Sequence, residues 1–152
     1  MRKILFICTG NYYRSKFAEI YFNHLQSQKE SQSYKSFSRG IRIDLKNNLG
    51  NISKYASDYL KKLSVNTVSC LPSKQICKRD LESATIIIGI DKEEHENYLI
   101  TKYPQYEAKY TFWDISDLYL KTSCVELPRL KQKIEELESE LLKECFGSLE
   151  IS

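Results

Sequence analysis

A cysteine and an arginine, with five residues between them, stand directly after a short apolar run near the start of the chain. The segment begins at Cys8 and ends at Arg14 and Ser15. The residues before it favour a strand, and those after it favour a helix. A loop of this length can curl so that its backbone N–H groups point inward, with the N-terminus of the following helix behind them. We therefore predict a loop that binds phosphate.

The side chains of this loop suit phosphoryl transfer. The field that binds phosphate would also stabilise a thiolate at Cys8 and make it a nucleophile at neutral pH. Arg14 offers a planar fork that can hold two phosphoryl oxygens in the transition state, which a lysine could not match. Ser15 could donate a hydrogen bond to the thiolate as it leaves. Gly10 and Asn11 tolerate the unusual backbone dihedrals of a tight loop.

The same residues also have a simpler interpretation, in which none of them is catalytic. Cys8 would then end a buried strand as a small apolar side chain, Ser15 would cap a helix and Arg14 would be a surface charge. A cysteine and an arginine at this spacing arise by chance fairly often. The apolar strand before the loop, the Gly-Asn pair and the serine agree with the anion loop, and we favour the catalytic interpretation.

Apolar patterns along the chain predict the elements that position this loop. They indicate strands at 3–8, 34–39, 84–90 and 110–113, and helices at 15–28, 52–63, 92–102 and from about 126 onward. The run 84–90 is continuous and β-branched, as in a parallel strand covered on both faces. We expect an α/β three-layer sandwich, with a mainly parallel four-stranded sheet between helices. Ligands of such sheets bind beyond the carboxyl ends of the strands, where Cys8 lies.

Composition and charge bound the function further. The chain has 152 residues, 41% hydrophobic and 28% charged, which predicts one folded domain over 1–152. The formal charge of +3 is mild and its basic residues are dispersed, so no nucleic-acid partner is expected. The apolar run at 4–8 is far too short to span a bilayer. We therefore expect no membrane association and a cytoplasmic location.

The cysteines are scattered and odd in number. They stand at positions 8, 70, 77, 124 and 145 and form no C-x-x-C pair, with too few histidines nearby for a zinc site. This pattern favours reduced thiols. We expect the chain to need neither a metal nor another cofactor.

The loop region resembles a known family in the run Ile4-Leu5-Phe6-Ile7-Cys8-Thr9-Gly10-Asn11, then in Arg14-Ser15 and Ala18-Glu19. Chains that open in this way are the low-molecular-weight protein tyrosine phosphatases, and the thioredoxin-coupled arsenate reductases share their fold. The resemblance implies hydrolysis of a phosphotyrosine protein or a small aryl phosphate through a phosphocysteine intermediate. It also implies that the turn Ser38-Arg39-Gly40 supports the loop through a hydrogen bond between Ser38 and Asn11.

The resemblance further implies a set of residues around the substrate. The expected substrate-binding residues are Thr9, Gly10, Asn11, Tyr12, Tyr13, Ser15 and Tyr119. The family also needs a general acid on a late loop, and the similar segment here is Trp113-Asp114-Ile115-Ser116-Asp117-Leu118-Tyr119. Asp117 matches the acid best because Tyr119 follows at the family's aromatic position, and Asp114 is the runner-up. Both aspartates could instead be only turn and cap residues.

Four departures from the family carry predictions of their own. Leu118 replaces the usual proline beside the acid, which predicts a less rigid loop. Tyr13 stands where many relatives keep a second cysteine, so a protective disulfide with Cys8 should be absent. Tyr12 is larger than the usual residue at the pocket mouth and could either stack on an aromatic substrate or partly block it. A histidine often found around 70–73 is missing, which removes one support of the loop.

Two other functions compete with the phosphatase. An arsenate reductase would need two further cysteines to pass a disulfide to thioredoxin, and Cys70 and Cys77 precede the strand after which its relay pair begins. A non-catalytic phosphate-binding module is the other alternative. The presence of both Cys8 and Arg14 argues against a pure binder, since binding alone needs no nucleophile.

Overall fold

The computed structural model describes residues 1–30, 32–116 and 119–151 and contains a parallel sheet between two layers of helices. The four strands lie in the order β2-β1-β3-β4, and each neighbouring pair is parallel. Their bounds are β1 (Arg2–Cys8), β2 (Tyr34–Gly40), β3 (Ile86–Gly89) and β4 (Tyr110–Phe112). This confirms the predicted fold class, and within the described residues the sheet is entirely parallel.

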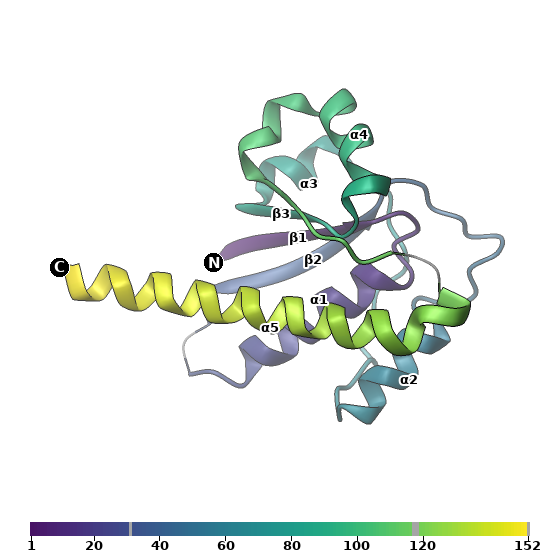
Figure 1. Ribbon diagram of the computed structural model, residues 1–152, viewed down its shortest axis with the longest axis horizontal. Helices are drawn as coiled ribbons and strands as arrows, with labels where there is room; N and C mark the ends of the chain where they lie inside the picture. The colour runs from purple at the N-terminus through teal and green to yellow at the C-terminus, as the bar shows by residue number, and fades with distance from the viewer. Residues whose placement is uncertain (31, 117–118, 152) are drawn as a thin grey trace.

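Helices cover both faces of the sheet (Figure 1). On one face lie α1 (Arg14–Ser27), α2 (Lys54–Lys62) and the long α5 (Tyr119–Ile151). On the other lie α3 (Lys78–Ser83), α4 (Lys92–Lys102) and a 3-10 helix, η1 (Pro104–Lys109). The strand β1 contributes to the core on both faces of the sheet. Ile4 and Phe6 pack in the apolar cluster on the side of α1, α2 and α5, whereas Leu5 and Ile7 pack in the cluster on the side of α3 and α4. All four side chains are fully buried, as expected for a central parallel strand.

Four elements differ clearly from the sequence expectation: η1 and α3, which were not expected, and β3 and α5, whose bounds differ. The helix α3 was not expected, because six residues are too few to show a helical period; Asp80 Oδ2 accepts the backbone N–H of Cys77 and stabilises its start. The strand β3 is shorter than predicted, since Ala84 ends α3. The helix α5 begins at Tyr119 rather than near Glu126 and continues through Pro128, because its apolar stripe packs in the core, chiefly against α1, and this packing overrides the local signal.

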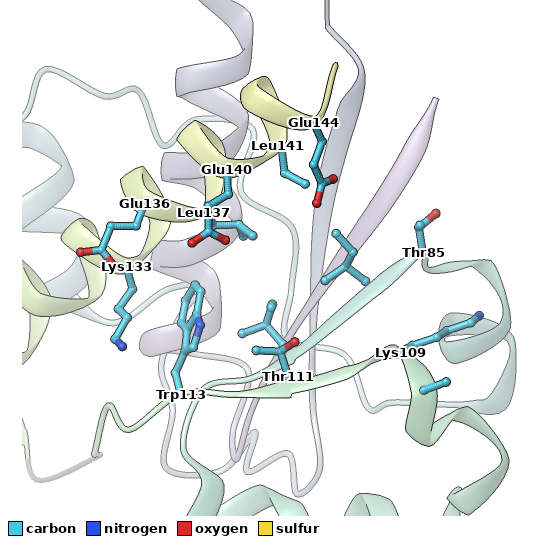
Figure 2. Close-up of a pocket in the computed structure, with 13 residues that line it drawn as sticks. Thr85, Lys109, Thr111, Trp113, Lys133, Glu136, Leu137, Glu140, Leu141 and Glu144 are labelled. Atoms are coloured by element: carbon cyan, nitrogen blue, oxygen red, sulfur yellow. The ribbon is translucent and has the colours of Figure 1, made fainter. Parts of the chain in front are cut away.

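A cavity of about 450 Å³ lies between α5 and the edge of the sheet at β3 and β4. Figure 2 shows Trp113 and Thr111 on the sheet side and three acidic side chains from successive turns of α5, Glu136, Glu140 and Glu144, on the other. This cavity is separate from a second cavity, which Cys8 lines and which is described below. Among the described residues, no helix is long and apolar enough to cross a membrane.

Candidate active site

The predicted phosphate loop joins the end of β1 to the start of α1, as the sequence indicated. The left-handed backbone conformation falls at Asn11, with φ of 50°, and not at Gly10. The loop rests on Gly40 of the neighbouring strand. A Cβ at that position would lie 2.8 Å from the carbonyl oxygen of Thr9 and 2.9 Å from the backbone nitrogen of Asn11, so only glycine fits there. Gly40 therefore allows the loop to sit directly against β2.

A buried chain of hydrogen bonds fixes the sulfur of Cys8. The amide of Asn11 donates to Ser15 Oγ at 2.9 Å, and Ser15 Oγ lies 2.8 Å from Cys8 Sγ. Either atom of the Ser15–Cys8 contact could be the donor, and when Cys8 is a thiolate it can only accept, so that the hydroxyl of Ser15 then donates to the sulfur. Ser15 therefore lies within hydrogen-bond distance of the sulfur, where the sequence predicts a donor to the thiolate leaving group.

Asn11 is the centre of this support. Its Nδ2 also donates to Ser38 Oγ at 2.9 Å, as the family resemblance implied, and Ser38 in turn donates to Glu19 Oε1. The backbone N–H of Lys74 donates to Asn11 Oδ1 at 2.8 Å, which fixes the orientation of the amide.

A serine supports the loop from the segment in which relatives often keep a histidine. Ser73 Oγ donates to the carbonyl oxygen of Asn11 at 2.6 Å. The sequence offered no sign of this contact, because Ser73 lies 62 positions further along the chain. The loop is therefore held from behind by side chains and backbone of two distant segments.

Arg14 is held by a carboxylate that sequence reasoning missed. Its side chain is 1% exposed, and Nη1 and Nη2 donate to the two oxygens of Glu94 at 2.7 and 3.0 Å. Nη1 also donates to the carbonyl oxygen of Ile115 at 2.8 Å. Glu94 is one of several glutamates in α4, so composition gave no reason to select it. It lies here because β3 is the neighbour of β1, and α4 follows β3 directly.

A second set of contacts joins Glu94 to the loop and to α4. Thr9 Oγ1 donates to Glu94 Oε1 at 3.0 Å and lies 3.2 Å from His95 Nε2. The backbone N–H of Asp91 donates to His95 Nδ1 at 3.0 Å. The imidazole is therefore neutral, with its proton on Nε2 toward Thr9.

Burial and neighbouring charges shift the pKa values of the ionisable groups around Arg14. Burial alone would raise the pKa of Glu94, but hydrogen bonds from Arg14 and Asp91 and the charge of Arg14 outweigh it and lower the pKa to about 2. Burial, together with the hydrogen bond and charge of Glu94, raises the pKa of Asp91 to about 6. Burial, with the charge of Arg14, lowers the pKa of His95 to about 4. Glu94 is thus the ionised partner of Arg14 at neutral pH.

A cavity of about 300 Å³ opens beside the loop. Its lining residues are Cys8, Gly10, Tyr12, Tyr13, Arg14, Asn47, Asn48, Ser53, Lys54 and Tyr55. Cys8 and Arg14 thus meet at one cavity, as the spacing predicted. The side chains of Asn11 and Ser15 are fully buried behind it and act as supports.

Two tyrosines follow each other in the wall of this cavity. The hydroxyl of Tyr12 donates to the carbonyl oxygen of Leu49 at 2.5 Å, which holds its ring at the wall. Tyr13 is 7% exposed and packs in the core with α1 and α2. Of these two side chains, Tyr12 is therefore the more accessible to a ligand.

The predicted general acid lies at the edge of what the structure describes. Asp117 and Leu118 lie outside the described residues, and Tyr119 is the first residue of α5. The runner-up Asp114 is described. Its carboxylate receives a hydrogen bond from Arg129 at 3.1 Å and its side chain is 71% exposed.

The chain matches the family described as low molecular weight phosphotyrosine protein phosphatase over residues 3–146. The chain belongs to this family. The match spans nearly the whole chain, and it includes the loop, α4 and the segment after β4. Membership supports a phosphatase activity. A comparison with curated proteins returned no significant match.

Solved structures of this phosphatase family share the fold. The YwlE arginine phosphatase from Geobacillus stearothermophilus is similar with a TM-score of 0.80 at 21% identity, over 97% of each chain. SP-PTP, a low molecular weight protein tyrosine phosphatase from Streptococcus pyogenes, has a TM-score of 0.76 at 23% identity, over 93% of each chain. The enzyme from T. tengcongensis has a TM-score of 0.77 at 23% identity, over 95% of this chain and 99% of its own.

Proposed function

We propose that the chain is a cysteine-dependent phosphatase that hydrolyses phosphotyrosine or related aryl phosphomonoesters. The observation that supports this most is the position of Cys8 Sγ, which lies 2.8 Å from Ser15 Oγ and lines the same cavity as Arg14. A nucleophile, a donor to its sulfur and a guanidinium for the phosphoryl oxygens are the parts that this chemistry needs.

The reaction has two steps. In the first, Cys8 attacks phosphorus while Arg14 and the loop N–H groups hold the equatorial oxygens; the S–P bond forms, the P–O bond breaks, and Asp117 gives its proton to the departing oxygen. In the second, Asp117 takes a proton from water, the water oxygen attacks phosphorus, and the S–P bond breaks. Ser15 stabilises the thiolate that leaves. The products are an alcohol or phenol and inorganic phosphate.

The cavity wall favours an aromatic substrate. Tyr12 and Tyr55 both line the cavity, and Tyr55 is 45% exposed. A phenyl ring between such walls gains area burial and offset stacking. A guanidinium could also stack there, and an arginine phosphatase is among the proteins of similar fold. We propose the aryl ester because its ring carries no charge to desolvate beside Lys54.

The test is hydrolysis of para-nitrophenyl phosphate by the wild type and by Cys8→Ser. We expect turnover to disappear in the variant while vanadate still binds, because the loop N–H groups and Arg14 remain. The matched control is Cys77→Ser, an exposed cysteine outside the cavity, which should keep wild-type kinetics.

Each contrary result points to another function. Full activity of Cys8→Ser would remove the proposed nucleophile. Vanadate binding without turnover in the wild type would favour a phosphate-binding module. Phosphoarginine cleaved faster than phosphotyrosine would overturn the proposed substrate class. Thioredoxin-dependent reduction of arsenate would favour the arsenate reductase.

A further inference from the structure

Beneath the proposed phosphate clamp lies an ion pair between the buried Arg14 and the half-buried Glu94, and the reaction above does not use Glu94. Glu94 meets the guanidinium of Arg14 end-on, one carboxylate oxygen to each terminal nitrogen, at 2.7 and 3.0 Å. Arg14 is 1% exposed, whereas the side chain of Glu94 is 31% exposed. A buried guanidinium needs a partner of opposite charge, because an uncompensated charge in a protein interior is strongly unfavourable.

The contacts determine the orientation of the guanidinium as well as its charge balance. Glu94 and the carbonyl oxygen of Ile115 together engage Nη1, and Glu94 also engages Nη2. A guanidinium is planar and rigid, so anchoring its terminal nitrogens sets the direction of the edge formed by Nε and Nη2. Arg14 also lines the cavity that contains Cys8.

The same carboxylate reaches the other end of the phosphate loop. Thr9, the residue after the nucleophile, donates its hydroxyl proton to Glu94 Oε1 at 3.0 Å. Glu94 therefore joins the beginning of the loop, its end and the first turn of α4. Among the described residues, these contacts make it the carboxylate that links Thr9 to Arg14.

We propose that Glu94 is a positioning residue, which holds Arg14 in the orientation that binds the phosphoryl group. This inference rests on the proposed function, because it assigns the phosphate to Arg14. The opposite role is also physically possible: a carboxylate on the clamp could compete with phosphate and inhibit the enzyme. The two roles predict opposite changes in anion affinity when Glu94 loses its charge.

The first experiment measures vanadate binding by calorimetry in Glu94→Gln. Loss of a charge-assisted pair should weaken binding about tenfold to a hundredfold. The matched control is Glu93→Gln, which removes the same charge from an exposed position in the same turn of α4 and should bind as the wild type does. Unchanged or tighter binding in Glu94→Gln would overturn the proposal, and tighter binding would indicate the inhibitory role.

A double-mutant cycle separates positioning from general structural support. If Glu94 acts through Arg14, then Glu94→Gln should add little to the loss of vanadate affinity that Arg14→Lys already causes. A full, additive loss in that background would contradict the proposal. If Glu94→Gln does not fold, Glu94→Asp tests the same point: it keeps the charge but is one methylene shorter, and it should weaken binding to an intermediate degree. Wild-type affinity in Glu94→Asp would count against the proposal.

Vanadate binding keeps this test separate from the proposed function. A wild type that binds vanadate but has no turnover would contradict the phosphatase and leave the role of Glu94 measurable. A turnover-competent enzyme that is indifferent to Glu94→Gln would contradict the positioning role alone.

Discussion

Two arginine–carboxylate clusters in this protein use the same ion-pair chemistry in different surroundings. Arg14 pairs with Glu94 at 2.7 Å and is 1% exposed. Arg129 pairs with Glu126 at 2.9 Å and with Asp114 at 3.1 Å and is 41% exposed. Exposed pairs contribute about 0–1 kcal/mol, whereas breaking a buried pair costs about 3–5 kcal/mol. Burial, not the pairing itself, separates the clamp from a surface contact.

The comparison also bears on the two candidate acids. Asp114 belongs to the exposed cluster, where Arg129 and Lys133 lie near its carboxylate. It is not among the described residues that line the cavity beside Cys8. This favours Asp117 as the proposed acid, and the assignment remains a prediction.

The largest expected effect is in Arg14→Lys. A point charge cannot reproduce the bidentate fork or the end-on pair with Glu94, so kcat/KM for para-nitrophenyl phosphate should fall by about a hundredfold or more. The matched control is Arg129→Lys in the exposed cluster, which should change kcat/KM by less than about twofold. Kinetics of Arg14→Lys within a few-fold of the wild type would show that the two arginines do not differ in the way proposed.

The next largest effect is expected in variants of the two candidate general acids. It is measured as the rate of hydrolysis of a series of aryl phosphate esters whose phenols differ in acidity. Asp117→Asn should slow esters of poorly leaving phenols about a hundredfold to ten-thousandfold, and esters of acidic phenols much less, since these depart without a proton. Asp114→Asn should show no such dependence. The reverse pattern would exchange the two assignments. No dependence in either variant would mean that the chain lacks a working general acid.

Oxidation of the cysteines offers a further comparison between a buried group, Cys8, and an exposed one, Cys77. Tyr13 stands beside Arg14 where many relatives keep a second cysteine, so oxidised Cys8 should proceed toward sulfinic acid. Prolonged peroxide treatment should then be poorly reversed by dithiothreitol, while Cys77→Ser changes nothing. Complete recovery, with a disulfide from Cys8 to another cysteine seen by mass spectrometry, would contradict this and raise the arsenate-reductase alternative.

A smaller effect is expected in the pH dependence of stability. Burial, with the charge of Arg14, lowers the pKa of His95 to about 4, below its ordinary value of about 6.5. Between these values the unfolded chain takes up a proton that the folded chain does not, so His95 contributes stability above pH ~6.5 that is lost as the pH falls toward 4. Urea unfolding should therefore show the wild type losing stability relative to His95→Gln over this window. A constant difference would mean that His95 titrates alike in both states.

The smallest effect is expected in Arg129→Ala. Its partners are exposed or lie on the same helix, so the free energy of unfolding should fall by less than about 1 kcal/mol. Thermal unfolding at low and high salt measures this, and salt should reduce the difference further. A loss of several kcal/mol would remove the distinction between the two clusters.

The sequence by itself determined the elements whose signals are local. The alternation of apolar runs gave the strands and most helices, because burial on a sheet leaves a period that neighbouring residues share. The loop from Cys8 to Arg14 could be predicted for the same reason, because the strand before it, the tight turn and the start of the following helix all lie within a few positions of the sequence. Ser15 beside the sulfur and Ser38 beside Asn11 agree with what the motif and the resemblance implied.

Only the tertiary structure decided which distant residues complete the site. Glu94 and Ile115 lie 80 and 101 positions from Arg14, and Ser73 lies 62 positions from Asn11. No local pattern marks one glutamate of α4 as the partner of a buried arginine. The order of strands does, because placing β3 beside β1 brings the start of α4 next to the phosphate loop. Such contacts depend on how elements meet in space, and that information is absent from any short stretch of the chain.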